Sequence, residues 1–365
     1  MRIILNGQQA FGKAALEAIL EKGEDEIVAV YTAPDKEGRP VDPVKEAALE
    51  HGLTVCQPAD YSLPEVIEEL KSWNADLMMM AYVIIFIPEE ARNVPKHGSL
   101  CFHPSLLPLH RGPSSINWPI IWGAEKTGLT IFYPDDGLDE GDICVQKEVE
   151  ITPDDTLGSV YFDKVFPLGI EAVLESIDLI RAGNPPHTPQ DESKATYEGW
   201  CRKADGEINW NRSQTEVYNQ IRGCNPQPGA WTTLNGKELQ IFDSQKADGS
   251  GRTGRICAIT EDGFVINAGR GGILVQRVRY DGGKKVSAKD FILLRAGSKH
   301  QRQSVTAWVG RGKITAERAN LNGPRAGPAG PGIHLLQRMA APGQILEHRI
   351  AEAGFADHTV HTLMR

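Results

Sequence analysis

The stretch Arg2-Ile3-Ile4-Leu5-Asn6-Gly7 is an apolar run that stops at a glycine, and a helical pattern over residues 11–21 follows it. A second apolar run, Glu26-Ile27-Val28-Ala29-Val30-Tyr31, comes next. Short apolar runs are typical of buried strands, and the longer periodic stretch between them is typical of a helix. This order predicts two neighbouring strands of a parallel sheet, covered by the helix that connects them.

The same alternation continues through the first half of the chain. Further strands are predicted over residues 53–56, 75–80, 99–103, 128–133 and 143–151. Further helices are predicted over residues 42–51, 63–73, 88–93, 114–122 and 156–182. We therefore expect an α/β domain, a Rossmann-like parallel sheet with helices on both faces, in which ligands bind beyond the carboxyl ends of the strands.

The chain changes character after the helical pattern that ends at Gly183. A polar, proline-rich stretch predicts a linker over residues 184–204, so the first domain is expected at 1–183. A helix over 213–222 and strands over 237–242, 253–259, 263–268 and 273–278 are then predicted. These predict a small OB-like β-barrel domain over residues 205–296, closed near Asp290.

Residues 297–365 differ again, because they hold five of the ten histidines, few acidic residues and a low-complexity stretch at 322–332. Composition of this kind predicts a poorly ordered tail, with one helix near residues 345–352. The sequence leaves open whether the tail is a natural extension, a basic contact for a partner, or the product of an altered reading frame.

Charge and composition limit the function. Residues 1–296 hold 30 Lys and Arg against 44 Asp and Glu, whereas residues 297–365 hold 9 against 4. An acidic body disfavours a polyanionic partner such as tRNA, because phosphate neutralisation supplies much of nucleic-acid affinity. The strand-like amino terminus, the short apolar run at 77–87 and six cysteines without a C-x-x-C pair lead us to expect a cytoplasmic protein with no membrane contact.

Three stretches of sequence carry residues suited to chemistry. The glycines of residues 6–12 lack the G-x-G-x-x-G spacing, so no NAD site is predicted. The strand at 99–103 delivers His103 to a proline-bounded loop, where a histidine can stabilise an oxyanion or transfer a proton. The loop at 135–142 holds four aspartates without EF-hand spacing, so one aspartate beside His103 is favoured over a metal site. Cys101 is either a nucleophile or inert strand packing, and packing is favoured.

Taken together, three motifs resemble the signature of the folate-dependent formyltransferases. They are His103-Pro104-Ser105-Leu106-Leu107-Pro108, Arg111-Gly112 and Gly137-Leu138-Asp139-Glu140-Gly141-Asp142. This family includes methionyl-tRNA, glycinamide ribonucleotide and sugar formyltransferases, and the amino-terminal hydrolase domain of 10-formyltetrahydrofolate dehydrogenase. Residues 223–233 are similar to the entry into the family's carboxyl-terminal barrel, so the resemblance covers about residues 1–296.

The resemblance implies a role for each matching residue. His103 matches the catalytic histidine and Asp139 the essential aspartate, with 10-formyltetrahydrofolate as formyl donor and neither metal nor NAD as cofactor. The pterin is expected in a cleft that also contacts Asp139. The other expected lining residues are Ile85, Phe86, Ile87, Ser105, Leu106, Leu107 and Pro108.

One position departs from the family pattern, because the usual Asn-x-His reads Cys101-x-His103. A thiol is a weaker hydrogen-bond donor than an amide, so the oxyanion is held differently here. The hydrolase domain of the dehydrogenase also lacks that asparagine, and residues 32–38, 86–88, 115–118 and 197–199 look like that domain. The chain is too short to add the dehydrogenase's carrier and aldehyde dehydrogenase modules, so NADP-dependent oxidation is not expected.

Three functions follow from the sequence. The favoured one is hydrolysis of 10-formyltetrahydrofolate or formyl transfer to a small amine. The second is methionyl-tRNA formylation, although residues 36–42 are short and mixed in charge where that enzyme carries a basic loop. The third is a folate-binding module without activity. This hypothesis stays open because Cys101 stands where the family pattern has an asparagine. A nucleotide sugar is a further conceivable acceptor.

Overall fold

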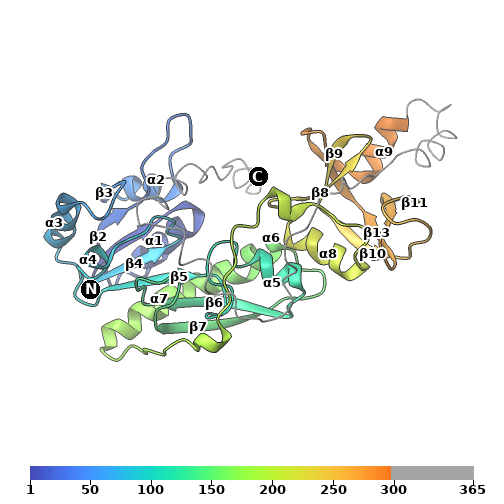
Figure 1. The fold of residues 1–365 in the computed structure, drawn as a ribbon. Helices are drawn as coiled ribbons and strands as arrows, with labels where there is room; N and C mark the ends of the chain where they lie inside the picture. The colour runs from blue at the N-terminus through green and yellow to red at the C-terminus, as the bar shows by residue number, and fades with distance from the viewer. Residues whose placement is uncertain (297–365) are drawn as a thin grey trace. The chain divides into compact units, whose positions relative to one another are not determined.

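The computed structural model describes residues 1–296 (Figure 1). The tail predicted over 297–365, with its helix near 345–352, lies outside the described residues. Residues 35–41 form a loop, with a hydrogen bond from the Arg39 N–H to the Lys36 carbonyl, and count as part of a separate compact unit. The description below concerns residues 1–34 and 42–296.

The first half of the chain forms a seven-stranded sheet flanked by helices. Its strands are β1 (Arg2–Gly7), β2 (Glu26–Tyr31), β3 (Val55–Cys56), β4 (Leu77–Ala81), β5 (Ser99–His103), β6 (Lys126–Phe132) and β7 (Ile143–Glu150). Its helices are α1 (Gln9–Lys22), α2 (Pro43–Glu50), α3 (Pro64–Ser72), α4 (Glu89–Arg92) and α5 (Asn117–Trp122). The strand order β3-β2-β1-β4-β5-β6-β7 agrees with the α/β sheet expected from the sequence.

The sheet is mostly parallel, and β6 is the one strand that runs in the opposite direction. Strands β1 to β5 pair in parallel, whereas β6 is antiparallel to both β5 and β7. A parallel pair needs a connection that runs back along the sheet. The loop between β6 and β7, residues 133–142, has no helix and is too short for that return, so these two strands run antiparallel. The expected α/β sheet is confirmed as a mostly parallel sheet, in which β6 runs opposite to the other six strands.

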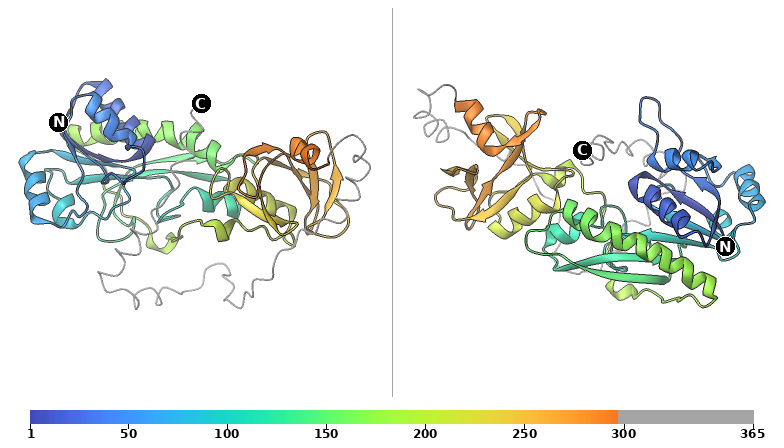
Figure 2. Two further views of the ribbon diagram at one scale, coloured as in Figure 1. Left: turned by 90° about the horizontal axis from the view of Figure 1, so that it is seen from above. Right: turned by 180° about the vertical axis from the view of Figure 1, so that it is seen from behind.

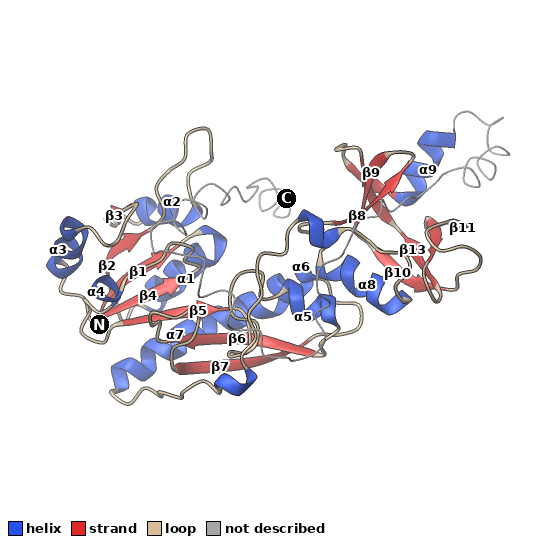
Figure 3. Cartoon of the chain, in the orientation of Figure 1, coloured by secondary structure: helices blue, strands red, loops and turns tan. Residues whose placement is uncertain are grey.

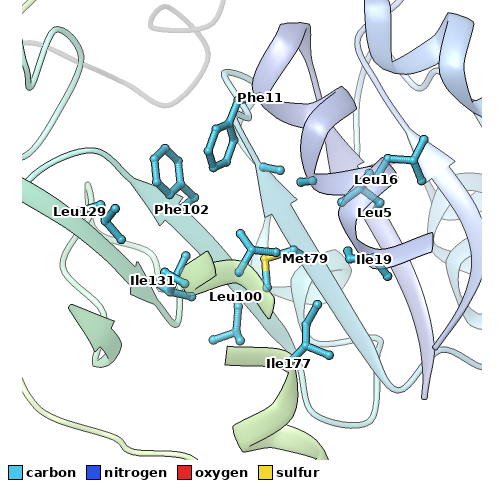
Figure 4. Packing of buried hydrophobic residues seen from close by; sticks show 14 of the residues in the cluster. Leu5, Phe11, Leu16, Ile19, Met79, Leu100, Phe102, Leu129, Ile131 and Ile177 are labelled. Atoms are coloured by element: carbon cyan, nitrogen blue, oxygen red, sulfur yellow. The ribbon is translucent and has the colours of Figure 1, made fainter. Parts of the chain in front are cut away.

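Side-chain alternation along the strands divides the core into two layers. Leu5, Met79, Leu100, Phe102 and Ile131 pack with side chains of α1 and of the long helix α7 (Phe166–Ala182) (Figure 4). Their neighbours point to the other face of the sheet, because successive residues of a strand alternate. That second layer, with α3 and α4, contains Ile4, Met78, Met80, Ile67 and Leu70. The helices therefore cover both faces, as the views in Figure 2 also show.

The helix predicted over residues 156–182 is interrupted. A short α6 (Leu157–Ser159) is followed by a π-helical turn at Val160–Val165 and then by α7. Pro167 explains the interruption, because it has no N–H to donate to the carbonyl four residues earlier. The helix predicted over 114–122 likewise starts late, at Asn117, since Ser114 has a left-handed φ of 64°.

The carboxyl-terminal domain consists of α8 (Gln214–Gly223), two four-stranded antiparallel sheets and α9 (Ala288–Ala296) (Figure 3). One sheet holds β10 (Ser244–Ala247), β13 (Gly272–Val275), β12 (Phe264–Asn267) and β11 (Ile256–Ile259). The other holds β15 (Lys285–Ser287), β14 (Arg277–Tyr280), β9 (Lys237–Ile241) and β8 (Ala230–Leu234). Buried residues of both sheets and α8 form a single cluster.

This domain differs from the sequence expectation in three places. The run predicted as one strand over 273–278 bends at Gln276 and passes from one sheet to the other, as strands at sandwich and barrel corners do. Strands β8, β10 and β15 were missed, and helix α9 spans Asp290, near which the barrel was expected to close. The expected boundaries at 183, 204 and 296 stay predictions. Among residues 1–296, no helix has the length and apolar character needed to cross a membrane.

Gly169 allows α7 to approach the sheet closely. A Cβ at this position would lie 2.8 Å from a ring carbon of Phe102 and 2.9 Å from one of Phe11, and these two rings stack with centroids 4.0 Å apart. We predict that Gly169→Ala lowers the free energy of unfolding by about 1–3 kcal/mol through overpacking, in spite of alanine's better helix propensity. Urea denaturation measures the change, with Glu171→Ala on the exposed side of α7 as control. An unchanged midpoint would contradict this packing.

Asp155 anchors the start of the interrupted helix. Its carboxylate accepts hydrogen bonds from the Thr152 N–H at 2.7 Å, from Ser159 Oγ at 2.8 Å and from Lys164 Nζ. Burial opposes ionisation, but the bonds from Lys164, Ser159 and Thr152 outweigh it and lower the pKa of Asp155 to about 2. A depressed folded-state pKa stabilises the fold above the ordinary carboxyl pKa, and the contribution is lost as pH falls toward 2.

We therefore predict that Asp155→Asn lowers the free energy of unfolding at pH 7 by about 1–3 kcal/mol. The difference from the natural chain should shrink between about pH 4 and pH 2, since the natural side chain is then protonated as well. Denaturant titrations across this range test the prediction, with the exposed Asp163→Asn as control. A difference that is constant with pH would count against the ionised form as the anchor.

Candidate active site

His103 ends strand β5 at the carboxyl edge of the sheet, and its side chain is 8% exposed. Leu100 and Phe102 point into the layer of α1 and α7, so Cys101 and His103 share the opposite face. Strand β4 runs parallel beside β5, with Met80 opposite Cys101. The loop after β4 therefore leaves the sheet at the same edge as His103.

The backbone of His110 orients the His103 ring. His103 Nε2 lies 2.9 Å from the His110 carbonyl oxygen. A carbonyl oxygen only accepts, so Nε2 carries a proton and donates it, whatever the charge of the ring. Nδ1 is consequently the ring nitrogen that remains for proton transfer. His110 itself adopts φ 59°, and its N–H donates to Thr196 Oγ1 at 2.8 Å.

The structure brings Asp139 to His103 from the acidic loop between β6 and β7. Asp139 Oδ2 lies 3.6 Å from His103 Nδ1 and accepts a hydrogen bond of 2.8 Å from the Gly112 N–H. Asp139 has a left-handed φ of 58°. Of the four aspartates in this loop, this is the one that faces the histidine, while Asp136 pairs with Arg92 at 2.6 Å. A carboxylate at this separation is too far for a direct hydrogen bond but close enough to favour the charged imidazolium, and one water can bridge the two groups.

Gly112 is constrained in two ways. Its φ is 90°, and a Cβ at this position would lie 2.7 Å from the Glu198 carbonyl oxygen. Only glycine therefore allows this backbone to pass Glu198 and to present its N–H to Asp139.

Cys101 lies next to the pair but is poorly suited to be a nucleophile. Burial raises the pKa of the Cys101 thiol, and the charge of Asp139 raises it further. The thiol therefore stays protonated at neutral pH, and the thiolate is the reactive form. Its Sγ has a long contact of 3.8 Å with the Phe102 carbonyl. This geometry agrees with the inert role expected for Cys101.

The expected lining of the folate cleft divides into reachable and buried side chains. Ser105 is fully buried, with its hydroxyl bonded to the Leu109 carbonyl at 2.7 Å, and Leu107 is 2% exposed. Leu106 and Pro108 are half-buried. In the loop after β4, Phe86 is 53% exposed and Ile85 is half-buried, whereas Ile87 packs into the core with α4. The side chains of Ile85, Phe86, Leu106 and Pro108 are therefore accessible from outside, whereas those of Ile87, Ser105 and Leu107 are buried.

The sequence analysis missed the contribution of residues 188–198, which it treated as linker. Thr188 exchanges backbone hydrogen bonds with Ile143, and Glu198 and Thr196 bond to both backbone groups of Arg111. Glu198 Oε2 also lies 3.3 Å from His110 Nδ1, with both side chains largely buried. The motif at 197–199 was noticed, but no local pattern indicates that this segment forms a wall of the site.

Arg111 connects this segment to the loops of the site. Its side chain is 0% exposed, and its guanidinium donates to both carboxylate oxygens of Glu192, at 2.5 and 3.0 Å, and to Tyr197 Oη. Burial opposes the charge, but the bonds to Glu192 and Tyr197 outweigh it and raise the pKa of Arg111. Within residues 1–296 no group of three His, Cys, Asp or Glu side chains is arranged to hold a metal ion.

Comparison with known families matches both halves of this architecture. Residues 1–173 match the formyl transferase family, and residues 201–295 match the formyl transferase carboxyl-terminal domain. The chain belongs to the formyltransferase family. The resemblance read from the His103 and Asp139 motifs is thereby confirmed at the level of the family.

Two kinds of relative share this family. A methionyl-tRNA formyltransferase of Geobacter metallireducens is 35% identical over 297 residues, covering 80% of this chain and 95% of the relative. The mitochondrial 10-formyltetrahydrofolate dehydrogenase of Homo sapiens is 36% identical over 306 residues, covering 80% of this chain and 33% of the relative. The chain thus spans nearly the whole of the first protein and about a third of the second.

Solved structures share the fold at lower identity. HypX from Aquifex aeolicus, in complex with tetrahydrofolic acid, superposes with a TM-score of 0.58 at 20% identity, covering 79% of this chain and 46% of that one. At this identity the likeness supports the fold alone.

We predict that the Cys101 thiol resists alkylation. Because its pKa is raised, the thiolate should stay scarce through pH 8–9, where an ordinary thiol ionises. Mass spectrometry after iodoacetamide treatment should find the exposed Cys257 modified first and Cys101 spared. Rapid modification of Cys101 at pH 7 would reopen its role as a nucleophile.

Proposed function

We propose that the chain releases or transfers the formyl group of 10-formyltetrahydrofolate, with water or a small amine as acceptor. The observation that carries the proposal is the separation of 3.6 Å between His103 Nδ1 and Asp139 Oδ2 at the carboxyl edge of the sheet. Family membership supports the formyl chemistry, and the relatives named as a methionyl-tRNA formyltransferase and a 10-formyltetrahydrofolate dehydrogenase support 10-formyltetrahydrofolate as donor.

In the proposed reaction the acceptor attacks the formyl carbon on N10. A new bond forms between the formyl carbon and the oxygen of water or the nitrogen of an amine. The formyl oxygen becomes an oxyanion in the tetrahedral intermediate. Protonated His103 Nδ1 stabilises this oxyanion, because Nε2 is already bonded to the His110 carbonyl. Asp139 keeps the imidazolium charged through its nearby carboxylate.

Collapse of the intermediate completes the reaction. The bond between the formyl carbon and N10 breaks, and N10 takes up the proton that the acceptor loses, relayed through water by Asp139. With water as acceptor the products are formate and tetrahydrofolate. With an amine they are the formamide and tetrahydrofolate, so no oxidant, metal or nicotinamide is consumed.

The pterin would lie where the exposed residues of the exit loops meet. Phe86 and Ile85 follow β4, Leu106 and Pro108 follow β5, and apolar walls with a few polar groups are typical of such sites. Cys101 supports water or a small amine as acceptor, since the hydrolase domain of the dehydrogenase, which this chain resembles, also lacks the family's asparagine at this position.

His103→Ala and Asp139→Asn should each reduce formyl release by about a hundredfold to ten-thousandfold, the range expected for loss of a proton-transferring group. Tetrahydrofolate formation, followed spectroscopically, measures the rate. The matched controls are His97→Ala, at an exposed histidine before β5, and Asp135→Asn, in the same acidic loop. A folded His103→Ala or Asp139→Asn variant that keeps most of its activity would overturn the assignment.

Methionyl-tRNA is the second candidate acceptor. The net negative charge of residues 1–296 counts against it, but the charge of the carboxyl-terminal domain taken alone favours it. Residues 1–200 hold 15 Lys and Arg against 34 Asp and Glu, whereas residues 201–295 hold 15 against 10. The carboxyl-terminal domain is therefore basic, as nucleic-acid contact requires. The coverage of 95% of a methionyl-tRNA formyltransferase also supports this candidate.

One experiment separates the candidates. The protein is incubated with 10-formyltetrahydrofolate alone, with small amines, and with methionyl-tRNA. Tetrahydrofolate formed without an added amine or tRNA supports hydrolysis, and formation that depends on a small amine supports transfer to that class. Formation only with methionyl-tRNA replaces the first proposal by the second. Folate binding without turnover in any mixture identifies an inactive module.

A further inference from the structure

Gln190 lies in the segment after α7 and bonds to three elements of the site. Its Oε1 accepts two hydrogen bonds from Arg111, from Nε at 3.1 Å and from Nη2 at 2.8 Å. Its Nε2 donates to the carbonyls of Asp139 at 2.9 Å and Gly141 at 2.7 Å. Both acceptor positions of the side-chain oxygen and both N–H groups of the side-chain nitrogen are therefore used in hydrogen bonds within the site.

The partners determine the orientation of the amide. A guanidinium has only donors, so the oxygen of Gln190 must face Arg111. The two carbonyls only accept, so the nitrogen must face Asp139 and Gly141. A glutamate at this position would match the amide in shape and would bond Arg111 well, but it would place an acceptor against two other acceptors.

The bonds of Gln190 act on a residue with a left-handed backbone. Asp139 has a φ of 58°, a conformation that persists in a non-glycine residue where the surroundings hold it. Gln190 holds the carbonyl of Asp139 itself and that of Gly141, two residues later. In this conformation the carboxylate reaches the Gly112 N–H and faces His103.

We propose that Gln190 is a positioning residue for Asp139, holding the acidic loop so that the carboxylate stays opposite His103 Nδ1. The inference builds on the proposed function, since it gives the paired carboxylate a dedicated support. Arg111 is the fixed point of the arrangement, because it precedes Gly112 in the chain and bonds the amide through its side chain. Asp139 is thereby held at two points: its carbonyl is linked to the Arg111 side chain through Gln190, and its carboxylate accepts from the Gly112 N–H.

The surroundings allow the idea to be tested without unfolding the site. Arg111 keeps its bonds to Glu192 and Tyr197 when Gln190 is replaced, so its buried charge stays compensated. The charged groups around the amide are Arg111, Asp139, Glu140 and Glu192. A glutamate at position 190 would therefore join a cluster that already holds more carboxylates than cations.

Gln190→Leu removes the amide, and Gln190→Glu keeps the shape and the Arg111 contact while removing the donors. We expect both variants to lower kcat for formyl release by about tenfold to a hundredfold, as a small misplacement of a reacting group does. The KM for 10-formyltetrahydrofolate should change by less than about threefold, since the carboxylate is needed mainly in the transition state. The control is Lys194→Ala, an exposed residue of the same segment that pairs with Asp191.

Amide hydrogen exchange of Gly112 gives a readout independent of activity. The Gly112 N–H donates to Asp139 Oδ2, so its exchange rate should be at least about tenfold higher in both variants than in the natural chain. Amides of β6, such as that of Ile131, should stay equally protected, which distinguishes loop release from general destabilisation.

The two outcomes that would overturn the proposal are distinct. A Gln190→Glu variant with natural kcat would show that contact with Arg111 is sufficient and that the donors to Asp139 are dispensable. Unchanged Gly112 exchange in both variants would show that the loop holds itself. If the natural chain forms no tetrahydrofolate with any acceptor, the proposed function fails, while the exchange measurement still decides the role of Gln190.

Discussion

The buried positive charge of Arg111 is the constraint on which the site depends. A fully buried guanidinium is costly unless it is paired and hydrogen-bonded throughout. Its partners Gln190, Glu192 and Tyr197 all come from the segment after α7, about eighty residues further along the chain. The chain therefore has to return to the site after the long helix, and in returning it supplies the wall behind His103.

This return also explains how two loops with strained backbones stay in place. His110 and Asp139 both have left-handed φ values, and each is bonded to the returning segment, through Thr196 and Gln190 respectively. Strain of this kind persists only where the surroundings over-determine the conformation. Because the two loops carry the groups that face His103, the geometry of the His103–Asp139 pair depends on contacts far away in sequence.

The sequence predicted most of the sheet, because its strands are short apolar runs separated by helical patterns and glycine or proline. The predictions went wrong where a tertiary contact or one residue outweighed the local pattern. Pro167 interrupts a helix whose periodicity looks continuous, and Gln276 is the bend of a run whose apolar pattern looks like one strand. The reversed direction of β6 is a property of the tertiary fold, because apolar patterns mark a strand but not the direction in which it enters the sheet.

The sequence by itself determined the family and the order of its two parts, and it singled out His103 and Asp139 as candidates, since these rest on motifs that are local in the chain. Only the tertiary structure decided which ring nitrogen of His103 is available, which expected folate-contacting side chains are buried, and that Gln190 bonds the carbonyl of Asp139. The physical reason is that motifs record which groups are present. Proton positions, burial and support depend on partners that the fold brings together from distant parts of the chain.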